Sequence, residues 1–398
     1  MSISQSDNQR LLPASLSLLL ALACGLIVAN IYYAQPLVGP ISASIGLSPQ
    51  AAGLIVTMTQ IGYGVGLLFV VPLGDLFENR LLVLVSLGIC VIALSGAAAA
   101  THPLSFLAAA LFIGIGSVAV QILVPYAAHL APEAVRGRVV GNVISGLMLG
   151  IMLARPVASF ITELSSWHTI FYLSAGFMAL LALVLSRALP IRKPNSKLRY
   201  GDLIGSMRYL ALNTPVLQRR ALYHACLFGA FSLFWTTVPL RLAGPEFQMS
   251  QAGIALFALA GVAGAVATPI AGRVADRGWS RPATGFAMLA VAMAFLITQL
   301  VQGGTTLALA LLVFAAILLD FGVAANLTIG QRAIFLLGAE YRSRLNGIYM
   351  STFFIGGALG SAIGGWAFAH GGWSLASWIG FSLPIAALLY FGTERGPS

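Results

Sequence analysis

Long apolar runs separated by short polar gaps fill nearly the whole chain. Each run has about 20 residues or more, the length that an α-helix needs to cross the hydrocarbon core of a bilayer. The pattern predicts twelve membrane spans, at residues 12–36, 49–73, 81–100, 104–129, 139–161, 167–189, 218–241, 250–272, 282–301, 305–330, 346–369 and 373–392. We therefore expect an all-α polytopic membrane protein with short connections between its helices.

The second half of the chain repeats the landmarks of the first half. Two arginines, a glycine and a tryptophan recur after 206 positions, and an Asp–Arg pair recurs after 201 positions. The repeated pairs are Arg136/Arg342, Arg138/Arg344, Gly141/Gly347, Trp167/Trp373, Asp75/Asp276 and Arg80/Arg281. Duplicated helical bundles are typical of transporters, which place a binding site between the two halves. The repeat predicts two pseudo-symmetric six-helix bundles.

The polar stretches predict the organisation of the chain in more detail. We expect a tail at residues 1–10, a first bundle at 11–189, a linker at 190–217, a second bundle at 218–393 and a tail at 394–398. Within the linker, residues 202–212 have the pattern of a short helix at the membrane surface. Glycines spaced along one face of spans 2, 5, 8 and 11 predict close helix packing, which we place at the seam between the bundles. These glycines are Gly62, Gly66, Gly146, Gly150, Gly253, Gly261, Gly264, Gly356, Gly360 and Gly364.

Composition and charge agree with a chain that is surrounded by lipid. Hydrophobic residues make up 59% of the chain and charged residues only 8%, against about 25% charged residues in a soluble domain. Of 21 Lys and Arg, 19 lie in the tails or in every second connection, and only Arg155 and Arg241 do not. This bias predicts that both termini are cytoplasmic, in a cell inner (plasma) membrane. The net charge of +10 is thereby explained by topology, and we predict no binding to nucleic acid.

The loops after spans 2 and 8 contain related motifs. They resemble the signature of the major facilitator superfamily, roughly Gly-x-Leu-x-Asp-Arg-x-Gly-Arg-Arg. The second copy keeps four of its positions: Gly272, Asp276, Arg277 and Arg281. The first copy keeps Asp75 and Arg80, but has Val71, Leu76 and Glu78 where the family has Gly, Arg and Gly. Together with the repeat, the resemblance covers essentially the whole chain and implies the major facilitator fold.

The resemblance also implies a charged latch on the cytoplasmic side. In the family, the Asp of the first copy contacts the start of helix 11 and holds the inside closed, as suits a carboxylate near a helix N-terminus. By resemblance, Asp75 and Arg80 form this latch. Its counterpart near helix 5 consists of Asp276, Arg277 and Arg281. Four further arginines either join this network or face lipid phosphates: Arg136, Arg138, Arg342 and Arg344. The alternative is that all of these charges are solvated and only set the topology.

Two charged residues lie well inside the predicted spans. Arg155 is in span 5 and Asp320 is in span 10, so they belong to opposite halves. A charge in hydrocarbon costs about 2.5 kcal/mol or more, and such residues face a partner or a cavity. We predict that Asp320 binds and releases a proton, while Arg155 favours its charged form or meets an anionic group of the substrate. The alternatives are a permanent structural ion pair or two unrelated solvated residues.

Helices 1, 4, 7 and 10 line the central cavity in the superfamily that the loops resemble. Five residues on these helices are our candidates for the substrate cavity: Asn30, Tyr33, Gln121, Trp235 and Asn326. Amides in lipid need partners, so hydrogen bonding between helices is the alternative role for the three amides. We interpret Tyr32 and Tyr126 as interfacial anchors, and His224 as a solvated residue near the cytoplasmic end of span 7.

Further features resemble the drug–proton antiporter branch and other bacterial efflux-type members. Span 5 is glycine-rich and ends in Arg155-Pro156, where the branch has Gly-Pro, and span 4 lacks the arginine that the branch usually carries. The run from Asn30 to Pro36 also looks like efflux-type members. The predicted function is secondary transport by alternating access, as proton-coupled efflux of small amphipathic compounds or drugs. The alternatives are a sugar or small-metabolite carrier, by uniport or symport, and a non-transporting membrane receptor.

The sequence predicts neither an enzyme nor a bound cofactor. It contains no phosphate-binding loop after a strand and no nucleophile–base set. Its three cysteines, Cys24, Cys90 and Cys226, lie within apolar runs and have no metal-ligand spacing. We expect the partners to be a small-molecule substrate, protons and the lipid bilayer, and the protein to be a monomer.

Overall fold

The computed structural model describes residues 14–192, 194, 199–301 and 303–394. The predicted N-terminal tail and all but Glu394 of the predicted C-terminal tail lie outside these residues. Helices dominate the described part of the chain, which contains no strand. The first half contains α1 (Ala14–Ala29), η1 (Gln35–Leu37), α2 (Val38–Ile45), η2 (Pro49–Ala51), α3 (Leu54–Phe69), η3 (Val71–Asp75), α4 (Asn79–Ala98), α5 (Pro103–Ser117), α6 (Ala119–Leu130), η4 (Glu133–Val135), α7 (Arg136–Leu164) and α8 (Trp167–Ala188). The second half contains α9 (Tyr200–Asn213), α10 (Pro215–Ala243), α11 (Gln251–Ala258), η5 (Leu259–Val262), α12 (Ala263–Asp276), α13 (Ser280–Ile297), α14 (Thr306–Phe335), η6 (Ala339–Tyr341) and α15 (Arg342–Gly392).

These helices make twelve membrane passes. Ten helical segments are long and apolar enough to cross a membrane, judged by length and composition. The run from α1 to α2 adds one more pass. The helix α15 contains two passes, because the chain reverses at Gly371 and Gly372, and Gly372 has a φ of +58° that favours glycine. The predicted all-α membrane fold with twelve spans is therefore confirmed. The short helix expected at residues 202–212 is also present, as α9.

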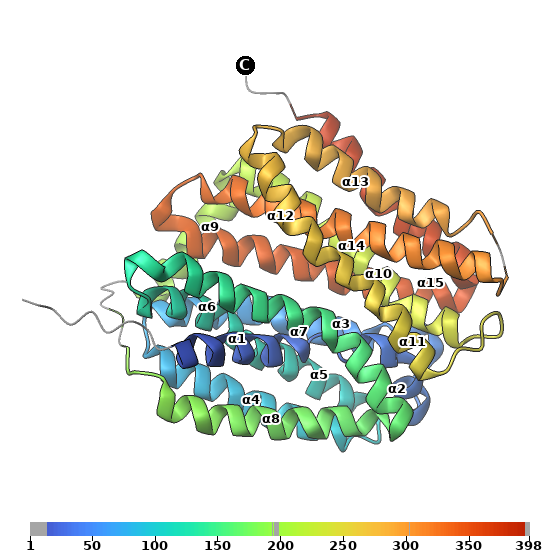
Figure 1. Cartoon of the computed structure of the whole chain (residues 1–398), viewed down its shortest axis with the longest axis horizontal. Helices are drawn as coiled ribbons and strands as arrows, with labels where there is room; N and C mark the ends of the chain where they lie inside the picture. Colours follow the sequence, from blue (N-terminus) through green and yellow to red (C-terminus); the bar gives the residue numbers. More distant parts are fainter. Residues whose placement is uncertain (1–13, 193, 195–198, 302, 395–398) are drawn as a thin grey trace, which may run out of the picture.

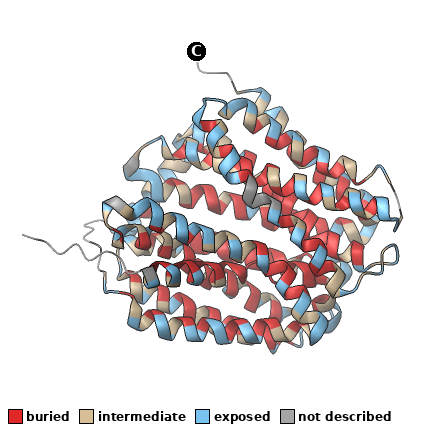
Figure 2. Cartoon of the chain, viewed as in Figure 1, coloured by how far each residue is buried: buried red, intermediate tan, exposed pale blue. Residues whose placement is uncertain are grey.

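The helices form two groups that lie against each other (Figure 1). Helices α1–α8 occupy the lower part of the view and α10–α15 the upper part. Helix α9 lies at the left of the view, and α2 and α11 lie at the right. We call the end of the molecule that carries α9 the linker end and the opposite end the far end. Buried residues follow the inner faces of the helices, while outer helices such as α8 and α13 expose many side chains (Figure 2).

Glycine contacts hold the helices of each half together. In the first half, a Cβ atom at Gly25 on α1 would lie 2.6 Å from the carbonyl oxygen of Gly146 on α7. Gly150, one turn further along α7, touches the backbone of Gly25 in the same way. Backbones at this separation leave no room for any side chain, so the two helices pack only because these positions are glycine.

The second half repeats this contact. Gly229 on α10 meets Gly356 and Gly360 on α15, as Gly25 meets Gly146 and Gly150. The shift is 204 residues from Gly25 on α1 to Gly229 on α10, and 210 residues from Gly146 on α7 to Gly356 on α15. The latter exceeds the 206-residue spacing of the loop arginines by four residues, about one helical turn, so the glycines face the same way in both halves.

Most of the predicted seam glycines therefore lie elsewhere. Gly62 also packs within its own half, against the backbone of α5 at Leu111. An exception is Gly261, which lies beside side chains from both halves. Placing the glycine faces at the seam between the bundles was wrong because the spacing shows that a face is tightly packed, but not against which helix.

The seam itself contains polar contacts between α3 and α15. The Thr57 hydroxyl donates to the carbonyl of Ala358 at 3.0 Å, and the Ser351 hydroxyl donates to the carbonyl of Gly64 at 3.0 Å. These contacts lie at two depths of the same helix pair, so α3 and α15 stay together over much of their length. A further bond joins Gln60 on α3 to Ser232 on α10 at 2.7 Å.

The glycine contacts generate a stability prediction. Gly150→Ala places a methyl group on the backbone of Gly25, and we expect it to lower the free energy of unfolding by about 1–3 kcal/mol. Gly360→Ala should have a similar effect through Gly229. The measurement is the thermal unfolding midpoint of the purified protein in detergent. The control is Gly88→Ala on α4, where the added methyl meets no atom within 4 Å; a loss of stability as large in this control would contradict the interpretation.

Candidate functional site

The two charges inside the membrane form an ion pair between the halves. Arg155 lies on α7 and Asp320 near the middle of α14, and the Nη1 and Oδ2 atoms are 3.8 Å apart. Only 2% of the Arg155 side chain and 6% of the Asp320 side chain are exposed. Each buried charge thus has its counter-charge on the other half of the protein. Such a pair is strongly destabilised when one partner is removed, because the other is left buried and alone.

Two further side chains hold the ion pair in place. Gln35 accepts a hydrogen bond from Nε of Arg155 at 2.9 Å, and Nε1 of Trp235 donates to Oδ1 of Asp320 at 2.8 Å. The Arg155 guanidinium also lies 4.1 Å from the centroid of the Trp235 ring, and Phe231 and Tyr32 lie within 5.6 Å of it. Trp235 therefore contacts the carboxylate through its N–H group and the guanidinium through its π face.

Interruptions in two helices meet at this ion pair. The first span is not continuous: α1 ends at Ala29, and η1 places Gln35 against Arg155 before α2 begins. The eighth span is interrupted at η5, where a Cβ atom on Gly261 would lie 2.7 Å from Nη1 of Arg155 and 2.9 Å from Oδ2 of Asp320. Irregular backbone at membrane depth is tolerated where it is buried in protein or lines a cavity. The interruptions bring an amide and a bare backbone to the two charges.

A cavity of about 460 Å³ extends from the ion pair toward the linker end. Its walls come from both halves and are mainly apolar and aromatic, with Met148 and Met152 on α7 and Phe353 on α15. From Asp320 to Phe335, the cavity-lining residue nearest the linker end of α14, the helix rises about 22 Å. A deep apolar cavity with a few polar groups at its closed end is typical of small-molecule sites.

Contacts between the halves close the far end. The Glu163 carboxylate, at the end of α7, accepts a hydrogen bond at 3.1 Å from the backbone N–H of Ala252 in the first turn of α11. A carboxylate at a helix N-terminus is favoured by the helix dipole. Gly39 on α2, in the first half, also packs against Leu240 on α10, in the second half. The cavity therefore opens at the linker end and is closed at the far end.

The predicted cavity residues have separate positions. Gln121 lies in the cavity wall and donates to the Tyr63 hydroxyl at 3.0 Å, and Trp235 lies behind the ion pair. The prediction that Asn30 and Tyr33 line this cavity is not met. Asn30 accepts a hydrogen bond from Ser174 on α8, and Tyr33 faces a groove on the outside of the first half.

Asn326 is the third residue for which the predicted location was wrong. It is 2% exposed and lies 2.9 Å from Nδ1 of His224, so it bonds within the second half. His224 in turn stacks on Phe353 and Tyr349 and is fully buried, which corrects the expectation that it is solvated. Asn30 and Asn326 thus each bond to a partner on a neighbouring helix, which was the alternative role for these amides.

Other residues at the site were not recognised from the sequence as its parts. Tyr32 was interpreted as an interfacial anchor, but it lines the cavity beside Arg155. Gln35 entered only as part of the run from Asn30 to Pro36, and Gly261 only as a packing residue. Glu163 was not singled out at all. The one available signal for Gln35 was the following Pro36, which cannot continue the hydrogen bonding of a helix.

The predicted latch residues all lie at the linker end. Asp75 lines a pocket of about 380 Å³ together with Arg136 and with Ser343 from the start of α15. Arg80 donates to the carbonyl of Leu189 at 3.3 Å, within the first half. Asp75 and the start of α15, which is the eleventh span, are thus neighbours. No hydrogen bond between Asp75 and α15 occurs among the described residues.

The second copy of the motif is engaged within its own half. Asp276 pairs with Arg332 on α14, and Arg281 donates to the backbone carbonyl of Glu394. The expected contact of Asp276 with the fifth span, which is α7, is therefore not present in this state. Of the remaining predicted latch residues, Arg277, Arg138 and Arg342 are exposed and Arg344 is half-buried. Of these, Arg342 bonds to the carbonyl of Phe335 and Arg344 to the hydroxyl of Ser206 on α9.

Comparisons with known proteins agree with this architecture. The sequence profile of the Major Facilitator Superfamily matches residues 20–311 and 220–398. An uncharacterized transporter, YgaY, of Escherichia coli is 42% identical over 386 residues, which cover 96% of each chain. A probable transporter of Streptomyces coelicolor is 34% identical over 363 residues, which cover 89% of this chain and 82% of the relative.

Solved structures provide a comparison of the fold alone. The nucleoside transporter NupG is 15% identical and has a TM-score of 0.77, over 95% of this chain and 99% of its own. A POT family transporter in complex with 5-aminolevulinic acid is 14% identical and has a TM-score of 0.74, over 95% of each chain.

The buried ion pair generates a prediction about stability. Arg155→Met or Asp320→Asn alone should lower the free energy of unfolding by about 3–5 kcal/mol, because each leaves one buried charge without its partner. The double variant should lose less than the sum of the two single losses. Thermal unfolding midpoints of the four proteins in detergent provide the measurement. Losses that simply add would show that the two side chains do not act as a pair.

Proposed function

Because the chain belongs to the Major Facilitator Superfamily of membrane transporters, we propose that it is a proton-coupled secondary carrier that exports small amphipathic compounds by alternating access. The observation that supports this proposal is the ion pair of Arg155 and Asp320, which joins the two halves at the closed end of a cavity. The cavity and the ion pair both lie within one chain, so a monomer suffices for the proposed cycle.

We place the linker end on the cytoplasmic side, with the chain divided between its two bundles at residues 190–217. The support is the charge distribution, because 19 of 21 Lys and Arg lie in the tails or in every second connection. Cytoplasmic connections carry this excess in membrane proteins. In this orientation the cavity is open to the cytoplasm, and the Glu163 contact belongs to the closed outer side.

In the proposed cycle, protonation of Asp320 controls the contact between the halves. The charged carboxylate attracts Arg155 and holds α7 against α14, so it stabilises the form that is closed at the far end. Protonation cancels the negative charge and leaves Arg155 with Gln35 and the π face of Trp235. The attraction between the halves is then weaker, and the far end can open. A proton gradient thereby biases the change of shape.

Export requires that substrate and proton use the same step in opposite directions. We propose that Asp320 releases its proton into the open cavity when a substrate enters from the cytoplasm. The bound substrate then takes the place of the proton in weakening the contact between Asp320 and Arg155, so the loaded carrier can open outward. After the substrate leaves, a proton from outside binds Asp320, and the protonated carrier returns to the form that is open to the cytoplasm. Asp320 lines the cavity, so a substrate bound there would lie near the carboxylate, which is the geometry that such competition needs.

The cavity walls favour an amphipathic substrate. Methionine side chains adapt to ligands of different shape, and three of them, Met148, Met152 and Met350, line the cavity. Phe231 and Phe353 offer flat apolar surfaces, and the charges at the closed end suit a substrate with one polar or ionised group. A sugar or other polar metabolite is the second candidate, because Gln121, Gln331 and Asn346 also line the cavity. A non-transporting receptor has no specific observation in its favour.

The coupling proposal predicts loss of proton movement in Asp320→Asn. Purified protein is placed in liposomes that contain a pH-sensitive dye, and a panel of lipophilic cations, neutral drugs, sugars and organic acids is added. Wild-type protein should move protons with an amphipathic member of the panel. Asp320→Asn should reduce this signal to the level of liposomes without protein, because an amide does not bind and release a proton near neutral pH.

The control is Glu133→Gln, which removes an exposed carboxylate from the connection before α7. It should retain the wild-type signal. Full proton movement in Asp320→Asn would refute the assigned proton carrier. Uptake or release of a sugar by wild-type protein, without movement of amphipathic compounds, would support the second candidate.

The latch proposal predicts slower turnover in Asp75→Asn. We propose that Asp75 meets the N-terminus of α15 when the linker end closes, and a charge at a helix terminus is worth about 0.3–1 kcal/mol. Loss of this charge should slow transport in liposomes about two- to fivefold while expression and thermal stability stay the same. Unchanged turnover would mean that Asp75 only sets the topology.

A further inference from the structure

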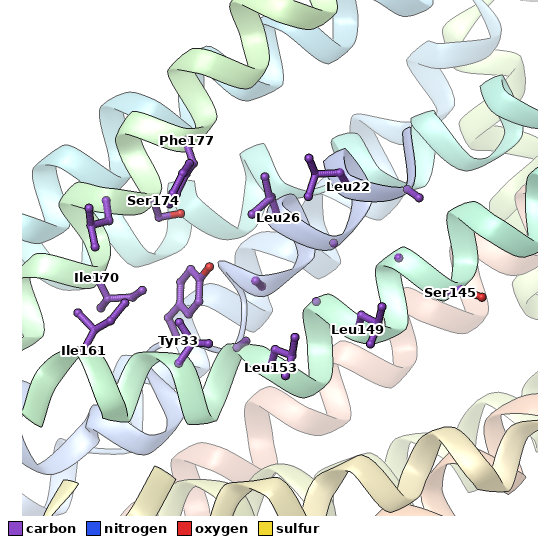
Figure 3. A pocket seen from close by; sticks show the side chains of 18 of the residues that line it. Leu22, Leu26, Tyr33, Ser145, Leu149, Leu153, Ile161, Ile170, Ser174 and Phe177 are labelled. Atoms are coloured by element: carbon purple, nitrogen blue, oxygen red, sulfur yellow. The ribbon is translucent and has the colours of Figure 1, made fainter. Parts of the chain in front are cut away.

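A groove of about 720 Å³ runs along the outside of the first half (Figure 3). It lies between α1, α7 and α8, and its walls include the exposed side chains of Leu22, Leu149 and Phe177. Tyr33 and Ser174 line one part of it, and Asn142 and Ser145 line the part near the linker end. The groove is separate from the central cavity, because the two lie on opposite faces of α7.

The second half differs from the groove at two equivalent positions, although Leu359 and Ile363, the equivalents of Leu149 and Leu153, are about as exposed as these. Val157 on the groove wall is 40% exposed, whereas Ala367, its equivalent 210 positions later, is fully buried. Leu383, the equivalent of Phe177 by the tryptophan spacing of 206, lies 3.4 Å from where a Cβ of Gly229 would be. At Gly25, the three nearest atoms all belong to the backbone of α7.

The part of the groove between the linker end and Tyr33 has the length of one lipid leaflet. From Asn142 to Leu153, α7 rises about 16 Å along the groove, and half of a hydrocarbon core is about 15 Å. The polar pair of Tyr33 and Ser174 lies beyond this apolar stretch. The amide nitrogen of Asn30, which bonds to Ser174 through its oxygen, has no hydrogen-bond partner among the described residues. A hydrocarbon chain that enters from the linker end thus meets polar groups near the middle of the membrane.

A positive charge lies at the open end of this apolar stretch. Arg138 precedes Asn142 by four residues on α7, so the two share one face of the helix. Its side chain is exposed, and no hydrogen bond or ion pair joins it to another described residue. Arg138 lies in the first turn of α7, where a membrane helix meets the lipid phosphates. Basic groups beside a groove between membrane helices bind anionic head groups.

We propose that this groove binds one acyl chain of an anionic phospholipid from the leaflet at the linker end, with the lipid phosphate paired to Arg138. The apolar walls provide the contact for the chain, and the arginine selects the charge of the head group. Asn142 and Ser145 supply hydrogen bonds to the glycerol region. The bound lipid fills the space that side chains fill in the second half.

The test uses the full-length protein in detergent, with equal amounts of phosphatidylglycerol and phosphatidylcholine of the same chain length. Native mass spectrometry counts the retained lipids. Wild-type protein should retain one phosphatidylglycerol in preference to phosphatidylcholine. Arg138→Gln should weaken this retention about fivefold, since one basic residue at the membrane surface contributes about 1 kcal/mol. Arg138→Lys should restore it.

A second variant tests the groove itself. Leu149→Trp fills the apolar stretch and should also abolish the preference. Its matched control is Leu359→Trp, the equivalent and equally exposed position of the second half, and the control for the charge is Arg273→Gln at the linker end of α12. Both controls should bind lipid like the wild type. Thermal unfolding of each variant separates loss of the site from loss of the fold.

Three results would overturn the proposal. One is equal retention of the two lipids by the wild-type protein, which removes the role of the charge. Another is unchanged retention in both Arg138→Gln and Leu149→Trp. A third is slower transport by Leu149→Trp with unchanged lipid retention, which would assign the groove to the transported substrate.

Discussion

A guanidinium and a carboxylate in hydrocarbon each need a counter-charge, and in this protein each finds it on the other half of the molecule. Removing either ion from water costs several kcal/mol, so the arrangement that brings Arg155 and Asp320 together is strongly preferred over one that separates them as charges. The neighbouring structure serves this contact. The first and eighth spans are interrupted beside the ion pair, and Trp235 contacts both of its partners. The closed far end follows from the same attraction.

Glycine backbones touch inside each half and at one place between the halves, where side chains make the other polar contacts. Within a half, glycine backbones touch, as at Gly25 and Gly150, and such contacts cannot slide because any shift brings atoms into overlap. Between the halves, Gly53 just before α3 touches the backbone of Ser361 and Gly365 on α15, and hydroxyl and amide side chains make further contacts, as at Thr57 and Gln60. Side chains can change rotamers and exchange partners at little cost. Two stiff bundles can therefore move as bodies where side chains join them, whereas the Gly53 contact must separate in any movement that parts α3 from α15.

The spans and the two charges could be predicted from the sequence because lipid leaves few choices. A segment in hydrocarbon must be a helix, and a charge there must be exceptional. The positions of the amides were harder to predict, because an amide can bond to whichever neighbour its helix face meets. Asn30 and Asn326 bond to Ser174 and His224, and nothing in their spacing points to those partners. The position of Gln35 depends on a local break in the first span, which hydropathy alone does not reveal.

The depth of the cavity also shapes the electric field across the membrane. Water and ions that enter the cavity bring the potential of the linker side up to Asp320. Most of the membrane voltage then falls across the layer between the ion pair and the far end, where α7 has only nine residues, about 14 Å, left to Leu164. An elementary charge that crosses the full voltage changes in energy by about 2.3 kcal/mol per 100 mV. A water-filled cavity would therefore concentrate the membrane voltage in this one layer, and any net charge that moves between Asp320 and the far end would cross most of that voltage.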